Sequence, residues 1–340
     1  MESGKPYGII LLEKDTLHQK ALNREKFDMT KFLELLFLKQ LKNIGNATIN
    51  KEYVPILECI NSIDDFLPLV ERREKRFSIS DLKLALEVAE RKYAEIVNTR
   101  GIEVITVFDD KYPARLHDLG DKKPVILYAR GNTNILSNQS IAVVGTRKPS
   151  AWSEMVEQRL VQKILDLSDY VIISGLALGC DGIAHQTTLE ANKKTVAVLP
   201  SGVNVITPSS HKQMAQNILD NDGCLLSEYE PKAKVTKSTY VERDAVVAAL
   251  ANATMVIECS EKSGTMHTVN SAFGMKRRLA CYYIDDVTKG HYDGNAYMMK
   301  TKKATKVSDT DELVTFLRSI SDRPIASESK QLSIFDVINE

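Results

Sequence analysis

Cysteine, tryptophan and long apolar runs are all scarce in this sequence of 340 residues. The five cysteines are widely spaced and form no C-x-x-C pair, so neither a metal site nor a disulfide framework is expected. No apolar stretch approaches the roughly 18 residues of a membrane-spanning helix. The acidic residue Glu2 stands where a signal peptide would be basic. We therefore expect a cytoplasmic protein that is neither secreted nor inserted into a membrane.

The chain also lacks any excess of charge, because 45 Lys and Arg residues balance 45 Asp and Glu residues. This balance argues against a polycation that coats nucleic acid over its whole surface, but it leaves local patches open. Basic runs occur at residues 147–148, 232–237, 276–278 and 300–306. Such a run is most often a solvated face, whereas Arg147 follows a predicted strand and is a better candidate for ligand binding.

The apolar pattern changes along the chain and divides it into four parts. Near the end of the second part, apolar residues recur every three or four positions, which predicts a helix from Asp81 to Thr99 with Ser80 as its N-cap. The expected parts are an unassigned N-terminal extension (1–28), a small helical domain (29–100), an α/β domain (101–320) and a flexible C-terminal tail (321–340).

Short apolar runs alternate with helix-length segments in the α/β part. Runs of this kind are typical of strands buried on both faces of a parallel sheet, and the segments between them are long enough for crossover helices. The sequence therefore predicts a doubly wound, mostly parallel Rossmann-like sheet. The predicted strands are residues 141–144, 170–173, 195–199, 223–226, 255–257 and 279–284.

A glycine-rich turn follows the second of these strands, between Ser174 and His185. Its three glycines permit a sharp turn and leave room for a phosphate at the N-terminus of the next helix, where unpaired amides attract an anion. Small and basic residues also follow two other strands, at 145–150 and 263–265. Because ligands of doubly wound sheets bind at the carboxyl ends of the strands, we expect one phosphate-binding site there. No G-x-G-x-x-G motif follows the first strand, so a nicotinamide or flavin cofactor is not expected.

Several segments match one family in both order and spacing, namely 110–116, 144–150, 174–185, 195–199, 225–228 and 263–265 with Thr268 and Ala272. From about Ile105 to Asp285 the chain resembles the DNA-processing protein A family, also called DprA or Smf. The helical segment around Ile44 is similar to the sterile-alpha-motif-like domain that precedes the Rossmann-like domain in that family.

The resemblance implies a single-stranded DNA-binding protein of DNA recombination, DNA uptake and natural transformation that acts without catalysis, cofactor or metal. It also implies a homodimer formed through the Rossmann-like domain and a RecA-type recombinase that receives the strand. Arg147 and Lys148, with backbone amides near Gly145 and Gly175, would hold phosphates along the sheet edge. The candidate DNA- or phosphate-binding residues are Gly145, Thr146, Arg147, Lys148, Ser150, Ser174, Gly175, Gly179, Asp181, His185, Gly202, Arg243, Ser263, Gly264 and Thr265.

The chain departs from the family pattern at several places, one of which lies on the expected path of DNA. Arg243-Asp244-Ala245 stands where the family has Arg-Asn-Arg, which removes a cation and adds a carboxylate on the expected DNA path. A nucleotide-binding sensor, or a degenerate relative of the LOG nucleotide hydrolases, is therefore the alternative function, and a scaffold with a degenerate site is a further one. Hydrolysis itself is not expected, because Thr268 stands where the LOG family has its catalytic glutamate.

Asp181 and His185 lie four residues apart on a predicted helix and would face the same side. A carboxylate that orients an imidazole can serve as a general base. The same spacing also gives an ordinary pair within a helix, which is the interpretation we favour.

The tail carries the sequence Gln331-Leu332-Ser333-Ile334-Phe335, which resembles the peptide that bacterial proteins use to dock on the DNA polymerase sliding clamp. Gln331, Leu332, Ile334 and Phe335 would then bind the clamp after a flexible leader. Their alternation is equally typical of an edge strand that folds back onto the protein. Both interpretations remain open at the level of sequence.

Overall fold

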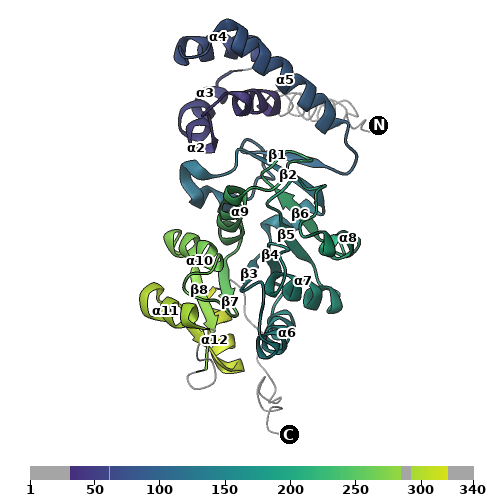
Figure 1. Cartoon of the computed structure of the whole chain (residues 1–340), viewed down its shortest axis with the longest axis vertical. Coiled ribbons are helices and arrows are strands. Elements are labelled where there is room, and N and C mark those ends of the chain that lie inside the picture. Colours follow the sequence, from purple (N-terminus) through teal and green to yellow (C-terminus); the bar gives the residue numbers. More distant parts are fainter. Residues whose placement is uncertain (1–30, 61, 285–291, 321–340) are drawn as a thin grey trace, which may run out of the picture. The chain divides into compact units, whose positions relative to one another are not determined.

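The structure, a computed structural model, describes residues 31–60, 62–284 and 292–320 (Figure 1). The chain forms two compact units. One comprises the described residues up to Arg100 together with Ile105–Tyr112, and the other comprises Gly101–Val104 together with the described residues from Pro113 onward. The predicted N-terminal extension and the predicted clamp-binding motif lie outside the described residues.

The described residues of the first unit are helical, and the first of them form a helix over residues 31–40. Its last helix is capped by Ser78, whose hydroxyl accepts from the Asp81 amide while the Asp81 carboxylate accepts from the Ser78 amide. The prediction of Ser80 as the cap is therefore wrong, because the reciprocal capping box requires the acidic residue three positions after the serine. The further elements are α2 (Asn46–Thr48), η1 (Ile49–Tyr53), α3 (Val54–Leu57), α4 (Ile63–Arg73) and α5 (Ile79–Val97).

This helical unit has a core of its own. Leu82 and Ala89 of the predicted apolar stripe are buried on α5. The Phe66 ring packs edge-on against Phe37 and Tyr53, with ring centroids 6.3 and 6.1 Å apart. Edge-to-face packing at this spacing is a favourable arrangement of aromatic rings. The small helical domain expected from the sequence is therefore present as helices with a packed interior.

The second unit contains β2 to β9 of a nine-stranded sheet, which has the strand order β1-β2-β6-β5-β4-β3-β7-β8-β9. All neighbours from β6 to β9 pair in parallel, whereas β2 runs antiparallel to β6. The doubly wound, mostly parallel sheet is confirmed, with a strand at each of the six predicted places. The strands are β1 (Glu103–Thr106), β2 (Ile126–Gly131), β3 (Ser140–Val144), β4 (Val171–Ser174), β5 (Thr195–Val198), β6 (Cys224–Ser227), β7 (Ala253–Val256), β8 (Arg278–Tyr282) and β9 (Thr305–Val307).

Helices cover both faces of this sheet. α6 packs against α7 on one face, and α9 packs against α10 on the other (Figure 1). No helix among the described residues has both the length and the apolar character needed to cross a membrane. The elements are η2 (Ala114–Lys122), η3 (Thr133–Ser137), α6 (Ala151–Leu167), α7 (Cys180–Glu190), η4 (Ser209–His211), α8 (Lys212–Asp220), α9 (Lys237–Leu250), α10 (Thr265–Gly274), α11 (Asp293–Lys302) and α12 (Thr310–Ile320).

The winding direction of the chain reverses between two neighbouring strands, β3 and β7. From β3 the chain winds outward through β4 and β5 to β6, and it then returns to β7 on the opposite side of β3. Beneath α6 and α12, buried residues such as Ile141, Leu160, Met255 and Phe316 share one apolar cluster that holds these strands in place. The crevice outside the carboxyl ends of β3 and β7 is where ligands bind in folds of this type.

Candidate phosphate-binding site

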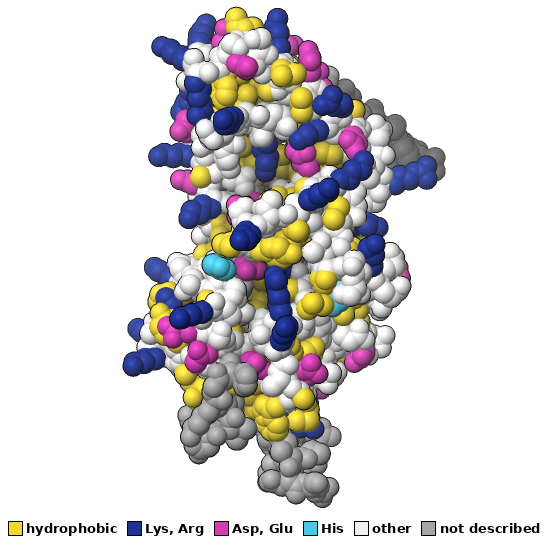
Figure 2. All heavy atoms as spheres, viewed as in Figure 1, with side chains coloured by type: hydrophobic (Ala, Val, Ile, Leu, Met, Phe, Trp, Pro, Cys, Tyr) yellow, Lys and Arg dark blue, Asp and Glu magenta, His cyan; other side chains and the backbone are white. Residues whose placement is uncertain are grey.

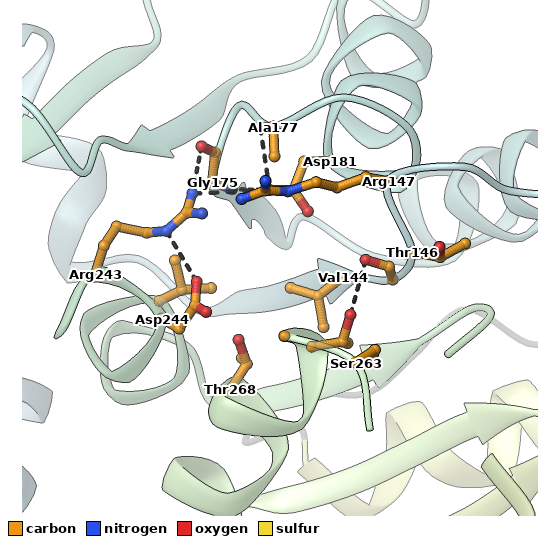
Figure 3. Close-up of a pocket in the computed structure, with 14 residues that line it drawn as sticks. Val144, Thr146, Arg147, Gly175, Ala177, Asp181, Arg243, Asp244, Ser263 and Thr268 are labelled. Carbon is orange, nitrogen blue, oxygen red and sulfur yellow. Dashed lines mark hydrogen bonds and ion pairs between the residues drawn. The ribbon is translucent and has the colours of Figure 1, made fainter. Parts of the chain in front are cut away.

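A pocket of about 390 Å³ lies at the predicted place, at the carboxyl ends of β3, β4 and β7 (Figure 3). The strand exits and the helices α9 and α10 form its wall. Figure 3 shows Arg243 and Arg147 entering from opposite sides, one from α9 and the other from the β3 exit. The lining residues are Val144, Gly145, Thr146, Arg147, Gly175, Ala177, Asp181, Arg243, Asp244, Val247, Ser263, Gly264, Thr265 and Thr268.

The exit of β3 is tightly held by its neighbours. Gly145 is required because a Cβ atom there would lie 2.9 Å from Cys180 Cβ and even closer to its sulfur. The Thr146 amide donates to the Glu258 carbonyl (2.7 Å), and the Thr146 carbonyl accepts from the Cys180 amide (3.1 Å). The loop is thereby tied to both β7 and α7, and its backbone has a fixed position at the pocket.

Arg147 projects from this loop and is exposed. Its guanidinium carbon lies 5.0 Å from the centre of the Tyr240 ring on α9, a cation–π contact that leaves the N–H groups accessible. No ion pair to another described residue engages Arg147. It is therefore the available cation of the pocket, as its position after the first predicted strand suggested.

The exit of β4 differs from the expectation of an open phosphate cradle. The Asp181 carboxylate accepts hydrogen bonds from the amides of Gly175 (3.1 Å) and Ala177 (3.2 Å). These are amides of the kind expected to hold a ligand phosphate, and an internal carboxylate already occupies them. An external anion at this turn would have to displace a buried side chain or bind in front of it.

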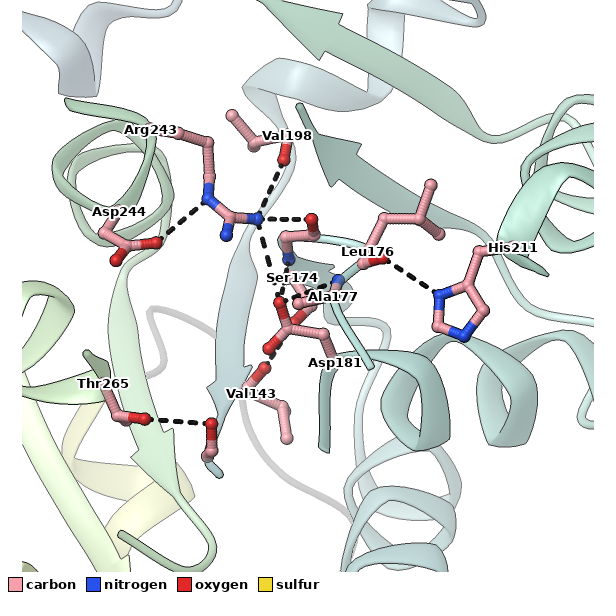
Figure 4. Close-up of polar contacts among 12 residues, drawn as sticks. Val143, Ser174, Leu176, Ala177, Asp181, Val198, His211, Arg243, Asp244 and Thr265 are labelled. Atoms are coloured by element: carbon pink, nitrogen blue, oxygen red, sulfur yellow. Dashed lines mark hydrogen bonds and ion pairs between the residues drawn. The ribbon is translucent and has the colours of Figure 1, made fainter. Parts of the chain in front are cut away.

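Arg243 lies behind the same turn and is buried, with a side-chain exposure of 4%. It donates to the carbonyls of Gly175 and Val198, the latter at 3.2 Å (Figure 4). Its Nε lies 2.9 Å from an Asp244 oxygen, and its Nη1 lies 3.8 Å from Asp181 Oδ2. The charge of Arg243 is thus neutralised inside the protein, where it joins β4, β5 and α9.

Asp244 brings a carboxyl group to the pocket wall. Burial raises the pKa of this carboxyl to about 6, against the lowering effect of the neighbouring Arg243 and the further raising effect of Asp181. Near neutral pH Asp244 is therefore largely ionised, and it opposes a negatively charged ligand. The carboxylate noted in the sequence as a departure from the family pattern does face the site.

The exit of β7 supplies small polar residues. Gly264 is open, since nothing lies within 4 Å of a Cβ atom built on it. Thr265, the first residue of α10, donates its hydroxyl to the Gly145 carbonyl (2.9 Å) and joins this exit to that of β3. Thr268 lies one turn further along the helix and also lines the pocket, as does Ser263. This wall carries no charge of its own.

Six of the fifteen candidate residues do not line the pocket. Gly179 has a φ of 74° and begins α7, where a side chain would collide with the backbone of Arg147. Lys148 is exposed beyond the lining residues.

Three further candidates outside the pocket, two serines and a glycine, have structural contacts. Ser150 caps α6 and donates to Glu258 (3.1 Å). Ser174 donates to the Val143 carbonyl (2.7 Å). Gly202, in the loop after β5, donates its amide to the carbonyl of Ala233 (3.0 Å) in the loop after β6. These contacts place the serines and Gly202 in the support of the pocket rather than in its wall.

His185 is fully buried and does not pair with Asp181. Its Nδ1 lies 2.8 Å from the Thr195 hydroxyl, which itself donates to the Ile172 carbonyl, so His185 donates from Nδ1. Burial, together with the smaller effects of the nearby His211 and Arg243, lowers the pKa of His185 to about 3. The imidazole is therefore neutral and structural rather than catalytic, but the expected helix pair is not formed, because Asp181 accepts from the Gly175 and Ala177 amides instead.

Five pocket residues were not among the candidate residues: Val144, Ala177, Asp244, Val247 and Thr268. Two of them carried a usable signal. Thr268 follows Thr265 by three positions and so shares its helix face, and Asp244 follows Arg243 directly. The other three are apolar residues whose direction depends on the packing of the sheet and α9.

The pocket does not belong to a large basic field. On the face shown in Figure 2, basic and acidic side chains of the described residues are interspersed. Within the described part of the chain, no group of three or more His, Cys, Asp or Glu residues could hold a metal ion. A small set of local contacts therefore defines the site.

Comparison with known proteins identifies the family. The model of the DNA recombination-mediator protein A family matches residues 103–318. This match includes every strand of the sheet and all lining residues of the pocket. The chain belongs to the DNA recombination-mediator protein A family, which confirms the resemblance found in the sequence.

Relatives and solved structures agree with this assignment. The chain is 32% identical to DNA processing protein DprA of Bacillus subtilis over 181 residues, which is 53% of this chain and 60% of the relative. It is 29% identical to DprA of Streptococcus pneumoniae over 243 residues, covering 72% and 80% of the two chains. The X-ray structure of the Streptococcus pneumoniae protein superposes with a TM-score of 0.64 at 25% identity, covering 83% of this chain and 96% of that chain.

A second solved structure is that of DNA processing protein A from Helicobacter pylori. It superposes with a TM-score of 0.57 at 26% identity and covers 64% of this chain and 98% of that chain. That protein is described as having a unique single-stranded DNA binding mode. The likeness extends over nearly the whole of the Helicobacter pylori chain.

Proposed function

We propose that this protein binds single-stranded DNA in DNA processing and recombination, and that it does so without catalysing a reaction. The observation that carries the proposal is the exposed, unpaired Arg147 at the reversal point of a sheet that belongs to this family. The single-stranded DNA binding described for the Helicobacter pylori relative supports the same ligand. Phosphates of the strand contact Arg147, and the neutral wall at Thr265 and Thr268 accommodates the backbone beside it.

The occupied turn after β4 favours a strand over a free nucleotide. A nucleotide sensor of this fold would place its phosphate on the amides of Gly175 and Ala177, and Asp181 already binds both. A strand needs no such buried cradle, because several accessible cations each hold one phosphate along its length. The ionised Asp244 weakens the attraction for either ligand but does not block Arg147.

The environment of the polar residues also supports binding without chemistry. His185 is neutral and has no access to the pocket, and Asp181 is held by two amides and faces Arg243. A general base must reach the proton that it removes and must titrate near the working pH. His185 meets neither condition, and the Asp181 oxygen that would take the proton already accepts from two amides.

Fluorescence anisotropy with oligo-dT, a duplex of equal length and a panel of free nucleotides tests the ligand. We expect oligo-dT to bind most tightly and its affinity to fall steeply between about 50 and 200 mM salt, because the contacts are to phosphate. A protein that binds a nucleotide tightly and oligo-dT not at all would instead be a sensor.

Charge reversal at one position tests the site. Arg147→Glu should weaken oligo-dT binding about tenfold or more. It should also lower the salt slope, which is the steepness of the fall of log affinity with log salt concentration, by about 1. Lys193→Glu is the matched control, since Lys193 is exposed at the opposite edge of the sheet and forms only a 3.9 Å pair with the solvent-exposed Asp169. Equal losses in the two variants would show that binding is diffuse and that the pocket is not its centre.

The family resemblance supports three further partners as proposals. We propose a homodimer, a RecA-type recombinase that receives the strand, and a sliding clamp bound through Gln331, Leu332, Ile334 and Phe335. Light scattering of the purified protein and pull-down with the recombinase or the clamp test these partners separately.

A further inference from the structure

Two basic runs that lie far apart in the sequence meet in the structure. Lys276, Arg277 and Arg278 join α10 to β8, and Lys302 and Lys303 end α11. All five side chains line a second pocket of about 470 Å³, together with the exposed ring of Phe273. Because β8 begins at Arg278, this pocket lies at the amino end of the strand, opposite to the edge that carries Arg147.

The charges of this second pocket are only partly neutralised. Arg277 is engaged by Asp118, at 2.9 Å, and donates to two backbone carbonyls. The side chains of Lys276, Arg278 and Lys303 are exposed and have no hydrogen-bond or ion-pair partner among the described residues. The described residues that line the pocket include no aspartate or glutamate. The pocket therefore presents three available cations.

The backbone at two of these cations is unusual. Lys276 and Lys303 have φ values of 58° and 56°, and each follows the end of a helix, where glycine is the favoured residue. A cation near a helix C-terminus interacts favourably with the helix dipole, which accounts for part of this preference. The helix dipole does not explain why Arg278, which lies on a strand, adds a third cation here. It also does not explain why the ring of Phe273 is 41% exposed beside these cations.

Phe273 adds an aromatic surface to the cations. The Lys302 ammonium lies 4.7 Å from the centre of the Phe273 ring and so covers one part of it. Exposed aromatic rings beside cations are the elements with which proteins bind single strands, the rings stacking on bases and the cations holding phosphates. An acidic peptide would use the cations but has no comparable use for the ring.

One helix connects the two pockets. Thr265 and Thr268 of α10 line the first pocket, and Phe273 and Gly274 at its other end line the second. A helix of ten residues is about 15 Å long, which a short stretch of single strand can span. α10 contains no acidic residue, and its exposed positions between the pockets include His267 and Asn270. No charge on α10 itself opposes a strand that follows it.

We propose that the pocket at Lys276, Arg278 and Lys303 is a second contact site for single-stranded DNA. The strand leaves Arg147, follows α10 and places further phosphates on these cations, with a base on Phe273. This inference rests on the proposed function, because it extends the path of the same ligand. Oligonucleotides too short to span α10 occupy the first pocket alone.

The test compares the variant Lys276→Glu/Lys303→Glu with the wild type on oligo-dT of about 3 and about 20 nucleotides, because the phosphates of the shorter one lie too close together to reach both ends of α10. The affinity for the long oligonucleotide should fall about tenfold or more and its salt slope by about 2, because two phosphate contacts are lost. The affinity for the short one should not change. Lys193→Glu, at the same amino edge of the sheet, should leave both affinities unchanged.

Two further variants distinguish a loss of DNA contacts from a folding defect. Lys276→Gly/Lys303→Gly removes the same charges and suits the left-handed backbone, so it should fold at least as well as the wild type and still lose affinity for the long oligonucleotide. Phe273→Ala should weaken the binding of the long oligonucleotide about fivefold or more. The salt slope should change little, because stacking of a base on a ring releases no counterions.

The outcomes separate the two proposals. If the wild type binds neither oligonucleotide, the proposed function itself fails. If the wild type binds both and the lysine variants bind the long one as tightly as it does, only the second contact site is refuted. Equal losses on short and long oligonucleotides would also refute it, because the effect would then be one of overall charge.

Discussion

Gly175→Ala should destabilise the protein far more than Gly264→Ala, although both replace a glycine of one pocket. A Cβ atom on Gly175 would overlap the Arg243 guanidinium and lie 2.8 Å from Asp181 Oδ2. A Cβ atom on Gly264 meets nothing within 4 Å, and the φ of Gly264 is −59°, which alanine adopts freely. The two substitutions therefore differ in what the new methyl group displaces.

The loss of stability expected for Gly175→Ala follows from the contacts that Arg243 would lose. The guanidinium would have to leave the carbonyls of Gly175 and Val198 and separate from Asp244 and Asp181. Disrupting a buried ion pair typically costs about 3–5 kcal/mol, because a charge is left without its partner. Gly264→Ala should stay within about 0.5 kcal/mol of the wild type. The free energy of unfolding of a typical protein is only about 5–15 kcal/mol, so the loss expected for Gly175→Ala is a large part of it.

Urea denaturation followed by circular dichroism measures both free energies of unfolding. A double-mutant cycle with Arg243→Met sharpens the test, since the methyl group of Gly175→Ala does little harm once the guanidinium is absent. The double variant should be about as stable as Arg243→Met alone. A loss below about 1 kcal/mol for Gly175→Ala, or simple additivity in the cycle, would show that Arg243 does not depend on the glycine.

Two further predictions concern pH. Because burial raises the pKa of Asp244 to about 6, oligo-dT affinity should fall roughly tenfold as pH rises from about 5 to 7 and a carboxylate forms in the pocket, and Asp244→Asn should remove this dependence in anisotropy titrations. An unchanged pH profile in Asp244→Asn would show that the dependence does not come from Asp244. His185 has a folded pKa of about 3 and an unfolded pKa of about 6.5, so the unfolded state binds the extra proton and stability should decline as pH falls below about 6.5, by about 2 kcal/mol at pH 5. His185→Gln should flatten this decline in urea denaturation at several pH values, and an equal slope in both proteins would contradict it.

The sheet could be predicted from the sequence because most of its strands are buried on both faces. β3 to β8 carry uninterrupted apolar runs, which give a clear signal. β9 was missed because Thr305–Val307 is short and only its last residue is buried. β2 has an apolar run of the same kind, from Ile126 to Ala129, but nothing in that run indicates its antiparallel direction.

The position of the site could be predicted, but its internal contacts could not. The glycines mark the strand exits because sharp turns and close packing require them at any such edge. Whether Asp181 faces a ligand or its own turn depends on the side-chain direction at the start of α7, which sequence spacing does not determine. The meeting of Lys276 with Lys303 likewise depends on how α10 and α11 end, since the two residues belong to different basic runs.

The carboxylate of Asp181 acts as a resident substitute for phosphate at the turn after β4. Because the amides of Gly175 and Ala177 are satisfied without a ligand, the turn keeps one shape in the free and bound protein, and binding spends no free energy on ordering it. The same turn with a neutral side chain at this position would be an open anion cradle. A single carboxylate at this position therefore decides whether the turn is suited to binding single-stranded DNA at its surface or a single nucleotide on its amides. A strand-binding protein and a nucleotide-binding protein of this fold can share every glycine of the turn.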